Sequence, residues 1–315
     1  MQRDAERAPS NPEATGPVPG VPELPDSREI DLSDRPLLDR LFAENPPQTS
    51  ELTFTNLWAW SGTHPVRLAR IGEAVCLWRG HEGTGALLAP LGGLDREGIE
   101  RALKWSESMG GRKVFTRVGT SAAERLVAAD PRLVATHDRD NDDYVYRVAD
   151  LAALAGRRYH KKRNLAKQFH EAIRTEYRAI APDLIDACRA HQVRWCDVRE
   201  CAIHPDLDAE DRAVGRVLDH WDRLGVFGAA LVGADGQVVA FAVGEHLTPG
   251  VAVTHFEKAY AQYPGAYQAI NQAFAEHALR GFEFVNREQD LGSPGMRQAK
   301  ESYYPAILAE KFTVG

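Results

Sequence analysis

Two residues that can hold or move a proton, His255 and Glu257, stand two positions apart in the segment VAVTHFEKA. Side chains alternate between the faces of a strand, so a strand here puts both on one face. Buried residues of this kind need partners, because an unpaired buried carboxylate costs several kcal/mol. The pattern favours a base that deprotonates a nucleophile, or a group that orders it. The alternative is a hydrogen-bonded core pair, or a histidine that faces solvent.

A second polar set follows the apolar run FEFV, at a strand end of the kind where α/β folds place ligand groups: Asn286, Arg287, Glu288 and Asp290. Arg297, Lys300 and Tyr303 recur every three residues, which places them on one face of a helix. The cations could bind a phosphate or an α-carboxylate, and Tyr303 could donate to an oxyanion. A salt-bridged cluster that holds the last helix on the sheet is the alternative.

The segment RRYHKKRNLAKQFHEAIR (157–174) carries seven Lys or Arg and one acid in a chain of net charge −7. A helix from about Tyr159 would bury Leu165, Phe169 and Ile173 and leave a basic outer face. Such a face suits RNA phosphates, while Arg158, Tyr159 and His160 could stack on unpaired bases. The residues predicted to contact RNA are Arg158, Tyr159, His160, Lys161, Lys162, Arg163 and Lys167. A solvated helix face and an anionic membrane surface remain open as alternatives.

Two possible metal motifs are set aside. Cys188, His191, Cys196, Cys201 and His204 supply zinc-type ligands, but their spacing matches no standard finger and the first two lie in a helical pattern. The run DRDNDD lacks the glycine and the closing glutamate of a calcium loop. We therefore predict no metal and no bound cofactor, and we expect the four cysteines to be reduced thiols.

Composition describes a globular protein. The chain has 315 residues, of which 43% are apolar, so it can bury one large domain or two. No apolar run is long enough to span a membrane and no leader precedes the globular pattern, so the default location is the cytoplasm. Residues 1–28, rich in Pro, Glu, Ala and Gly, are predicted to be a disordered tail.

The order of expected elements predicts a mixed α+β fold. Residues 29–155 contain three short strands, a helix, a strand, a helix and the strand YVYRV. Residues 156–315 begin with the basic helix and continue as two helices, a hairpin with an Asp-Gly turn, a strand, a helix, a strand, a helix and a strand. The second order resembles the N-acetyltransferase-like (GNAT) fold, and the first half resembles a degenerate copy.

The strings FTNLWAW, LAPLGG, YVYRVADLAALAGRRYHKKRN, HFEKA, YPGAYQAINQAFA, FVNREQDLG and GMRQAKESYYP carry a family resemblance. They are similar to soluble relatives of the C-terminal domain of phosphatidylglycerol lysyltransferase, from about Leu52 to the last residue. The resemblance implies tandem GNAT-like domains, as in the Fem transferases, and transfer of an aminoacyl group from aminoacyl-tRNA to an amine or hydroxyl. The multi-helix membrane portion of the best-known members is missing, so the acceptor could be a lipid or a small molecule, with peripheral membrane contact.

The expected donor site separates this activity from acyl-CoA chemistry. GNAT enzymes that use CoA hold its pyrophosphate on bare backbone N–H groups of a glycine-rich loop. Here the junction reads KAYAQYPGAYQAINQ, with one glycine and several bulky side chains. We therefore rank CoA below aminoacyl-tRNA, although Lys258 and Tyr267 could contact a substrate. The remaining alternatives are an acyl-CoA N-acyltransferase and a non-catalytic protein that binds RNA or a membrane surface.

Overall fold

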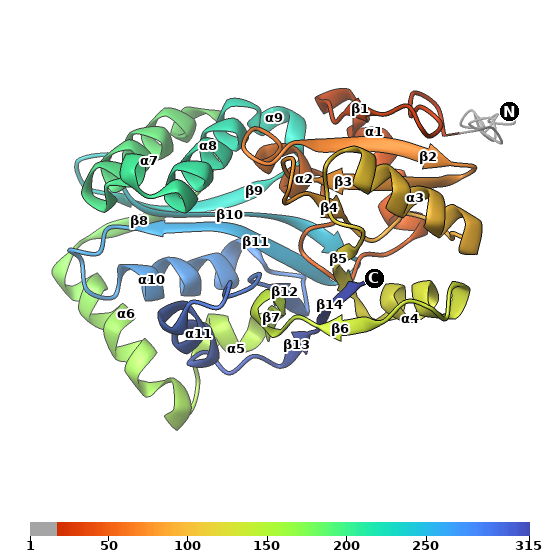
Figure 1. Cartoon of the computed structure of the whole chain (residues 1–315). Coiled ribbons are helices and arrows are strands. Elements are labelled where there is room, and N and C mark those ends of the chain that lie inside the picture. Colours follow the sequence, from red (N-terminus) through yellow and green to blue (C-terminus); the bar gives the residue numbers. More distant parts are fainter. Residues whose placement is uncertain (1–17) are drawn as a thin grey trace, which may run out of the picture.

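The computed structural model describes residues 18–315, which form two seven-stranded sheets (Figure 1). The first sheet, with helices α1 to α4, is called the first lobe. Its strand order is β1 (Arg28–Glu29), β2 (Val66–Ile71), β3 (Ala74–Arg79), β4 (Ala86–Leu87), β5 (Phe115–Gly119), β14 (Lys311–Val314) and β6 (Ala135–His137). Among the named strands of this sheet, within residues 18–315, β4 and β5 are the parallel pair.

The second sheet, with helices α5 to α11, is called the second lobe. Its order is β8 (Thr175–Ala179), β9 (Phe227–Gly233), β10 (Val238–Thr248), β11 (Val251–Ala259), β12 (Phe284–Asn286), β7 (Asp143–Arg147) and β13 (Ile307–Ala309). Here β11 and β12 are the parallel pair. The two sheets therefore match position by position, which explains why the first half of the sequence looks like a degenerate copy of the second.

The two lobes exchange one strand each. Strand β7 follows β6 of the first lobe but pairs with β12 and β13 of the second. Strand β14 follows β13 of the second lobe but pairs with β5 and β6 of the first. The predicted domains, 29–155 and 156–315, therefore do not coincide with the pairing of the strands.

Helices cover both sheets. They are α1 (Arg35–Glu44), α2 (Phe54–Trp60), α3 (Arg96–Ser108), α4 (Thr120–Ala129), α5 (Val148–Ala153), α6 (His160–Ala172), α7 (Ile185–Arg199), α8 (Pro205–Asp219), α9 (Trp221–Leu224), α10 (Ala266–Ala273) and α11 (Pro294–Glu301). In Figure 1, α7 and α8 cover one side of the second sheet, while α6 and α10 lie on the other. No helix within residues 18–315 has the length and apolar character needed to cross a membrane.

Two apolar cores hold these layers. One core is built from the first sheet together with residues of α7 and α8 and the facing side of the second sheet, such as Phe241 and Phe256. The other fills the space between the second sheet and α5, α6 and α10, and includes Tyr144, Phe169 and Ile270. Because the first core includes residues of both lobes, the lobes pack as one body.

The predicted tail is partly ordered. Residues 1–17 lie outside the described part of the chain. Val18, Val21 and Leu24 are buried against the first lobe, and Glu23 accepts from Arg70 and Arg101 at 2.7 and 3.0 Å. The prediction of disorder is therefore wrong for residues 18–28, because three apolar side chains and one doubly paired carboxylate were enough to anchor the segment.

Candidate active site

The site begins where two parallel strands separate. Strands β11 and β12 pair through three residues each, and the pairing ends at Val253 and Asn286. Beyond that point β11 continues while β12 stops, which opens the sheet. His255 and Glu257 lie on the part of β11 that extends beyond β12, and both line a cavity there, as their alternation predicts.

This cavity, called the interlobe cavity, has a volume of about 880 Å³ and is lined by both lobes. That size is typical of small-molecule sites. The first lobe contributes Asn56, Trp60, His64, Arg79 and Arg117. The second lobe contributes, among others, Lys162, Glu210, His255, Glu257, Tyr267, Arg287, Glu288, Lys300 and Tyr303. The structure thus brings together eight of the residues predicted for a site.

His255 is clamped between two carboxylates. Its Nε2 lies 2.8 Å from Oε1 of Glu245, and its Nδ1 lies 2.9 Å from Oε1 of Glu288. Burial lowers the pKa of His255, but the two hydrogen bonds and charges outweigh it and raise the pKa to about 10. The imidazolium donates from both nitrogens, so His255 orders Glu288 rather than accepting a proton. Of the two predicted roles for His255, this geometry supports the ordering role over that of the base.

Helix α2 of the first lobe supports the same carboxylates. Its Thr55 donates to Glu245 at 3.0 Å, and its Asn56 donates to Glu288 at 3.4 Å. Thr53 is the N-cap of this helix, and its side chain accepts the backbone N–H of Asn56. The cap therefore holds Asn56 itself in place. The segment FTNLWAW of the first lobe therefore helps to hold two carboxylates of the second lobe in place.

Arg287 and Glu257 form a second charged pair in the cavity. Arg287 donates from Nη2 to both carboxylate oxygens, at 3.2 and 3.3 Å, and Asn271 donates to Glu257 at 3.0 Å. Burial lowers the pKa of Arg287, but Glu257, Tyr146 and Tyr303 together outweigh it and raise the pKa, so the guanidinium stays charged. Its Nη1 is buried and finds no acceptor among residues 18–315. A ligand oxygen in the cavity would satisfy that donor.

Lys300 reaches the cavity from α11. Its Nζ donates to the backbone carbonyl of Arg287 and, at 3.3 Å, to that of Glu288. Burial lowers the pKa of Lys300 to about 8, and the charge of Arg287 adds to the effect. An ammonium has three N–H donors, so Lys300 can lose one proton, keep both carbonyl bonds and present a lone pair.

Tyr303 forms one wall of this end of the cavity. Its ring lies between the guanidinium of Arg287, 5.0 Å from the centroid, and the ammonium of Lys162 at 4.2 Å. Burial raises the pKa of Tyr303, so its hydroxyl stays protonated and remains a donor. That state matches the predicted role of donating to an oxyanion.

Three residues predicted for the site belong to the scaffold instead. Asn286 is fully buried, donates to Asp143 at 2.9 Å and accepts the backbone N–H of Glu288 at 2.7 Å. Asp290 accepts from Tyr144 at 2.6 Å and from Arg297 at 2.8 Å. None of Asn286, Asp290 and Arg297 lines the cavity, which corrects the catalytic and substrate-binding roles predicted for them. The salt-bridged cluster considered as the alternative describes Asp290 and Arg297.

The basic segment divides into exposed and engaged residues. Tyr159 is 1% exposed and donates to the carbonyl of Tyr303 at 3.0 Å, so its ring is not available to stack on a base, contrary to the prediction. Arg163 donates to the carbonyls of Leu154 and Gly156. Arg158 pairs with Asp150 at 3.0 Å. His160, Lys161 and Lys167 are exposed on α6, whereas Lys162 points into the interlobe cavity.

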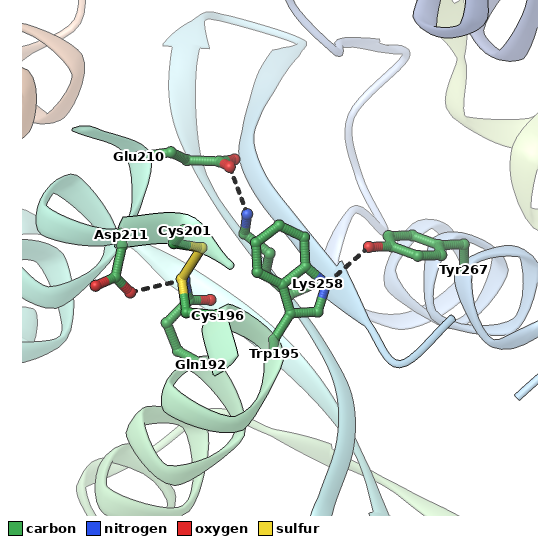
Figure 2. Close-up of a disulfide and its surroundings, with 8 residues drawn as sticks. All are labelled: Gln192, Trp195, Cys196, Cys201, Glu210, Asp211, Lys258 and Tyr267. Atoms are coloured by element: carbon green, nitrogen blue, oxygen red, sulfur yellow. Dashed lines mark hydrogen bonds and ion pairs between the residues drawn. A yellow bond between two sulfur atoms is a disulfide. The ribbon is translucent and has the colours of Figure 1, made fainter. Parts of the chain in front are cut away.

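Lys258 is paired within the protein. Its Nζ lies 2.6 Å from Oε2 of Glu210 and 3.8 Å from the ring centroid of Trp195, whose indole donates to Tyr267 at 3.1 Å (Figure 2). Burial lowers the pKa of Lys258. The predicted contact of Lys258 with a substrate is therefore not supported, while Tyr267 does line the cavity.

A disulfide joins Cys196 and Cys201 beside this group (Figure 2). Helix α7 ends at Arg199, and the next residue, Glu200, takes a left-handed conformation with φ of 53° and turns the chain so that the two Cα atoms lie 5.0 Å apart. The expectation of four reduced thiols is wrong for this pair and holds for Cys76 and Cys188. Among residues 18–315, no cluster of three or more His, Cys, Asp or Glu is arranged to hold a metal ion.

Sequence reasoning missed the first-lobe half of the site. Asn56, Trp60, Arg79 and Arg117 lie far from β11 in the sequence, and no local pattern connects them with it. For Glu245 the sequence did hold an indication, because a carboxylate within the apolar strand VVAFAVGEHLT needs a partner.

The sequence matches a known family over most of its length. The family described as phosphatidylglycerol lysyltransferase, C-terminal, matches residues 42–315. No curated protein matches the chain at significant similarity. A conserved protein of unknown function from Bacteroides thetaiotaomicron is 30% identical, with a TM-score of 0.83 over 91% of this chain and 98% of that one.

More distant structures share the fold. L-PGS from Bacillus licheniformis is 12% identical, with a TM-score of 0.62 over 93% of this chain and 92% of that one. A tandem GNAT protein from the clavulanic acid biosynthesis pathway is 12% identical, with a TM-score of 0.51 over 92% and 97% of the two chains. The mixed α+β fold with two tandem GNAT-like units, predicted from the order of elements, is thereby confirmed.

Proposed function

Because the chain belongs to the family of phosphatidylglycerol lysyltransferase C-terminal domains, a family of aminoacyltransferases, we propose that it transfers an aminoacyl group from aminoacyl-tRNA to an amine or hydroxyl. One observation carries the proposal. The interlobe cavity places two carboxylates, a charged guanidinium and a lysine of lowered pKa around one space. With this donor, the reaction belongs in the cytoplasm, where charged tRNA is made.

The tRNA is proposed to lie on α6. His160, Lys161 and Lys167 offer an exposed basic face to phosphates, and Lys162 turns from the same helix into the cavity. A few such contacts supply affinity that falls with salt. The end of the tRNA that carries the aminoacyl group would enter the cavity beside Lys162, pass Tyr303 and bring its ester to Arg287.

The chemistry needs no covalent intermediate. The acceptor nitrogen or oxygen attacks the ester carbonyl, the new C–N or C–O bond forms, and the bond to the ribose oxygen breaks. Lys300, with a pKa of about 8, accepts the proton of the nucleophile and can return it to the ribose hydroxyl that leaves. The free Nη1 of Arg287 and the hydroxyl of Tyr303 donate to the oxyanion. Glu257 and Glu288 remain anions that can hold the α-ammonium of the donor.

Acyl-CoA is the weaker candidate donor. A CoA pyrophosphate would need the N-terminus of α10 to be open. A Cβ added at Gly265, the residue that caps this helix, would lie 2.0 Å from the carbonyl oxygen of Leu165 in α6. This close contact of α6 with the cap supports aminoacyl-tRNA over CoA.

The test is transfer from a pool of radiolabelled aminoacyl-tRNAs into the lipid and water-soluble fractions of a cell extract. We expect labelled product that requires the protein. Lys300→Met should lower the single-turnover rate by at least a hundredfold while tRNA binding persists. Lys104→Met, which changes an exposed lysine of α3, is the matched control and should leave the rate unchanged. Transfer from acyl-CoA but from no charged tRNA would contradict the proposal.

A further inference from the structure

Besides Nη1 of Arg287, two polar side-chain atoms of residues that line the interlobe cavity are buried without a partner. One is a donor, Nη1 of Arg79, which is the last residue of strand β3. The other is an acceptor, Oδ1 of Asn56 in helix α2. Neither atom has a hydrogen-bond partner within residues 18–315. Because buried polar groups are normally paired, the cavity is complementary to a ligand that brings both an anion and a donor.

Arg79 is the cation that lacks an anion. Its guanidinium forms no ion pair with the part of the chain that the structure describes, and its Nη1 is buried. Burial lowers the pKa of Arg79 to about 10, and the charge of Arg117 adds to that, so the guanidinium is still charged at pH 7. A buried arginine is normally paired with an acid. A single free guanidinium fork matches the two coplanar oxygens of a carboxylate.

The neighbouring cation, Arg117, is already engaged. Its Nη1 donates to Oε1 of Glu51 at 3.3 Å, and the same oxygen accepts from Lys311 at 2.8 Å. The register of β5 with β14 shifts at this point, and Arg117 takes a left-handed conformation with φ of 55°. Irregularities of this kind re-aim a side chain beside a site. Arg117 therefore adds positive charge to this end of the cavity and leaves Arg79 as the free fork.

Asn56 supplies the opposite chemistry in the same region. Its Nδ2 donates to Glu288 at 3.4 Å, which leaves Oδ1 as the unused acceptor of a residue that is 6% exposed. Glu288 is also one of the charges that act on Arg79. An amide oxygen beside an anionic carboxylate favours the N–H of an ammonium over a neutral hydroxyl. The unpaired acceptor and the unpaired donor therefore surround one carboxylate.

We propose that Arg79 and Asn56 form a subsite for a free amino acid as the acceptor, with Arg79 binding its carboxylate and Asn56 its amine. The inference rests on the proposed function, which gives the α6 end of the cavity to the donor. The carboxyl group of the aminoacyl unit is esterified to the tRNA, so the free carboxylate is that of the acceptor. The product is a dipeptide.

The transfer step balances with groups already in the cavity. The bound ammonium loses one proton to solvent, and the free amine attacks the ester carbonyl. The amide C–N bond forms and the bond to the ribose oxygen breaks. The second proton of the amine passes to Lys300, in its neutral form, and from there to the ribose oxygen. The carboxylate of the acceptor takes no part in the bond changes and stays on Arg79.

The first experiment measures binding without transfer. The full chain is melted with each of the standard L-amino acids in turn, and the one that raises the melting temperature most is titrated by calorimetry. Its C-terminal amide, which has no carboxylate, its N-acetyl form, which has no amine, and glycerol 3-phosphate, the phosphate probe, should each bind at least tenfold more weakly. No rise with any amino acid, or binding that one of these three probes equals, would overturn the proposal.

Variants separate a ligand-binding role of Arg79 from a structural one. Arg79→Met should raise the dissociation constant for the amino acid at least tenfold, while Arg125→Met, which changes an exposed arginine of α4, should bind as the wild type does. Removal of an unpaired buried charge relieves a cost, so Arg79→Met should melt at or above the wild-type temperature without ligand. A variant that melts several degrees lower would mark Arg79 as part of the scaffold and overturn the assignment.

Transfer kinetics test the subsite and the proposed function separately. With the amino acid as acceptor, Arg79→Met should raise the KM for the amino acid and leave the KM for aminoacyl-tRNA unchanged. A raised KM for an aspartyl- or glutamyl-tRNA instead would give Arg79 to the side chain of the donor and overturn the proposal. Transfer to another acceptor that ignores Arg79 would refute the subsite and leave the function intact. Amino-acid binding through Arg79 with no transfer from any charged tRNA would do the reverse.

Discussion

The charge on His255 makes a prediction that can be checked without knowing the substrate. The histidine is 2% exposed and lies between Glu245 and Glu288. Burial lowers its pKa, but the hydrogen bonds and charges of the two carboxylates together outweigh burial and raise the pKa to about 10 from the ordinary 6.5. The folded pKa lies above the unfolded one. The stability that the ion pairs contribute is therefore fully present below about pH 6.5 and is lost as the pH rises through 10.

The stability that these ion pairs contribute can be worked out from the same pKa values. A pKa that moves from 6.5 to about 10, at ~1.4 kcal/mol per pH unit, corresponds to about 5 kcal/mol at its upper bound. His255→Gln leaves two buried carboxylates without a cation, so at pH 6 we expect the free energy of unfolding to fall by several kcal/mol. Between pH 7 and 9.5 the gap between wild type and variant should narrow by about 1 kcal/mol per pH unit. Over this range the folded wild type keeps a proton on His255 that the unfolded chain releases, whereas the variant has no such group.

Urea unfolding at pH 6, 7, 8 and 9.5 measures this gap. His204→Gln is the control, since His204 is exposed and its side chain caps no helix amide, and it should follow the wild type at every pH. Titration of the His255 ring by NMR gives an independent value. A gap that stays constant between pH 7 and 9.5, or a ring that titrates near 6.5, would refute the reasoning about the clamp.

Three further predictions concern a buried ion pair, the disulfide and two lysines of α6. Lys311→Met leaves Glu51 and Asp143 buried without their ammonium, so the free energy of unfolding should fall by about 3–5 kcal/mol in urea; a loss under 1 kcal/mol would contradict the ion-pair assignment. Reduction of the disulfide that closes the short loop after α7 should cost about 2 kcal/mol by loop entropy, and a thermal scan that is unchanged by reductant would argue against the bond. Lys162→Met should lower the rate of transfer at saturating aminoacyl-tRNA, whereas Lys161→Met should mainly weaken binding and flatten its salt dependence; identical kinetics in the two variants would contradict their different orientations.

Local pattern was enough to place the second-lobe half of the site. Alternation put His255 and Glu257 on one face, and the run after FEFV supplied Arg287 and Glu288, because strand direction alone decides where these side chains point. The same reasoning could not separate Asn286 from its neighbours. Whether a polar residue at a strand end faces a cavity or a buried carboxylate depends on which strand lies beside it.

The neighbouring strand was not predictable from pattern. The alternation in YVYRV predicts a strand, but it does not predict that this strand joins the second sheet. Strand pairing uses backbone hydrogen bonds, which every residue can form, so the side chains do not reveal the partner strand. The crossing brings Asp143 next to Lys311, which enters the first sheet at the start of β14. The first-lobe residues Arg79 and Arg117 reach the cavity only through this arrangement of two lobes. Tertiary packing, rather than local preference, therefore decides half of the site.

The exchanged strands also bear on how the cavity works. Opening the lobes would pull β7 or β14 from the ladders on both of its sides, and it would expose the apolar core that includes residues of both lobes. It would also separate Thr55 from Glu245 and Asn56 from Glu288, the contacts that cross the boundary at the site itself. A cavity built in this way is formed before any substrate arrives, so little binding energy is lost in closing it. Under the proposed function, the donor and the acceptor would meet in a fixed space, and the packing of the two lobes, rather than a hinge motion, would position the ester against the nucleophile.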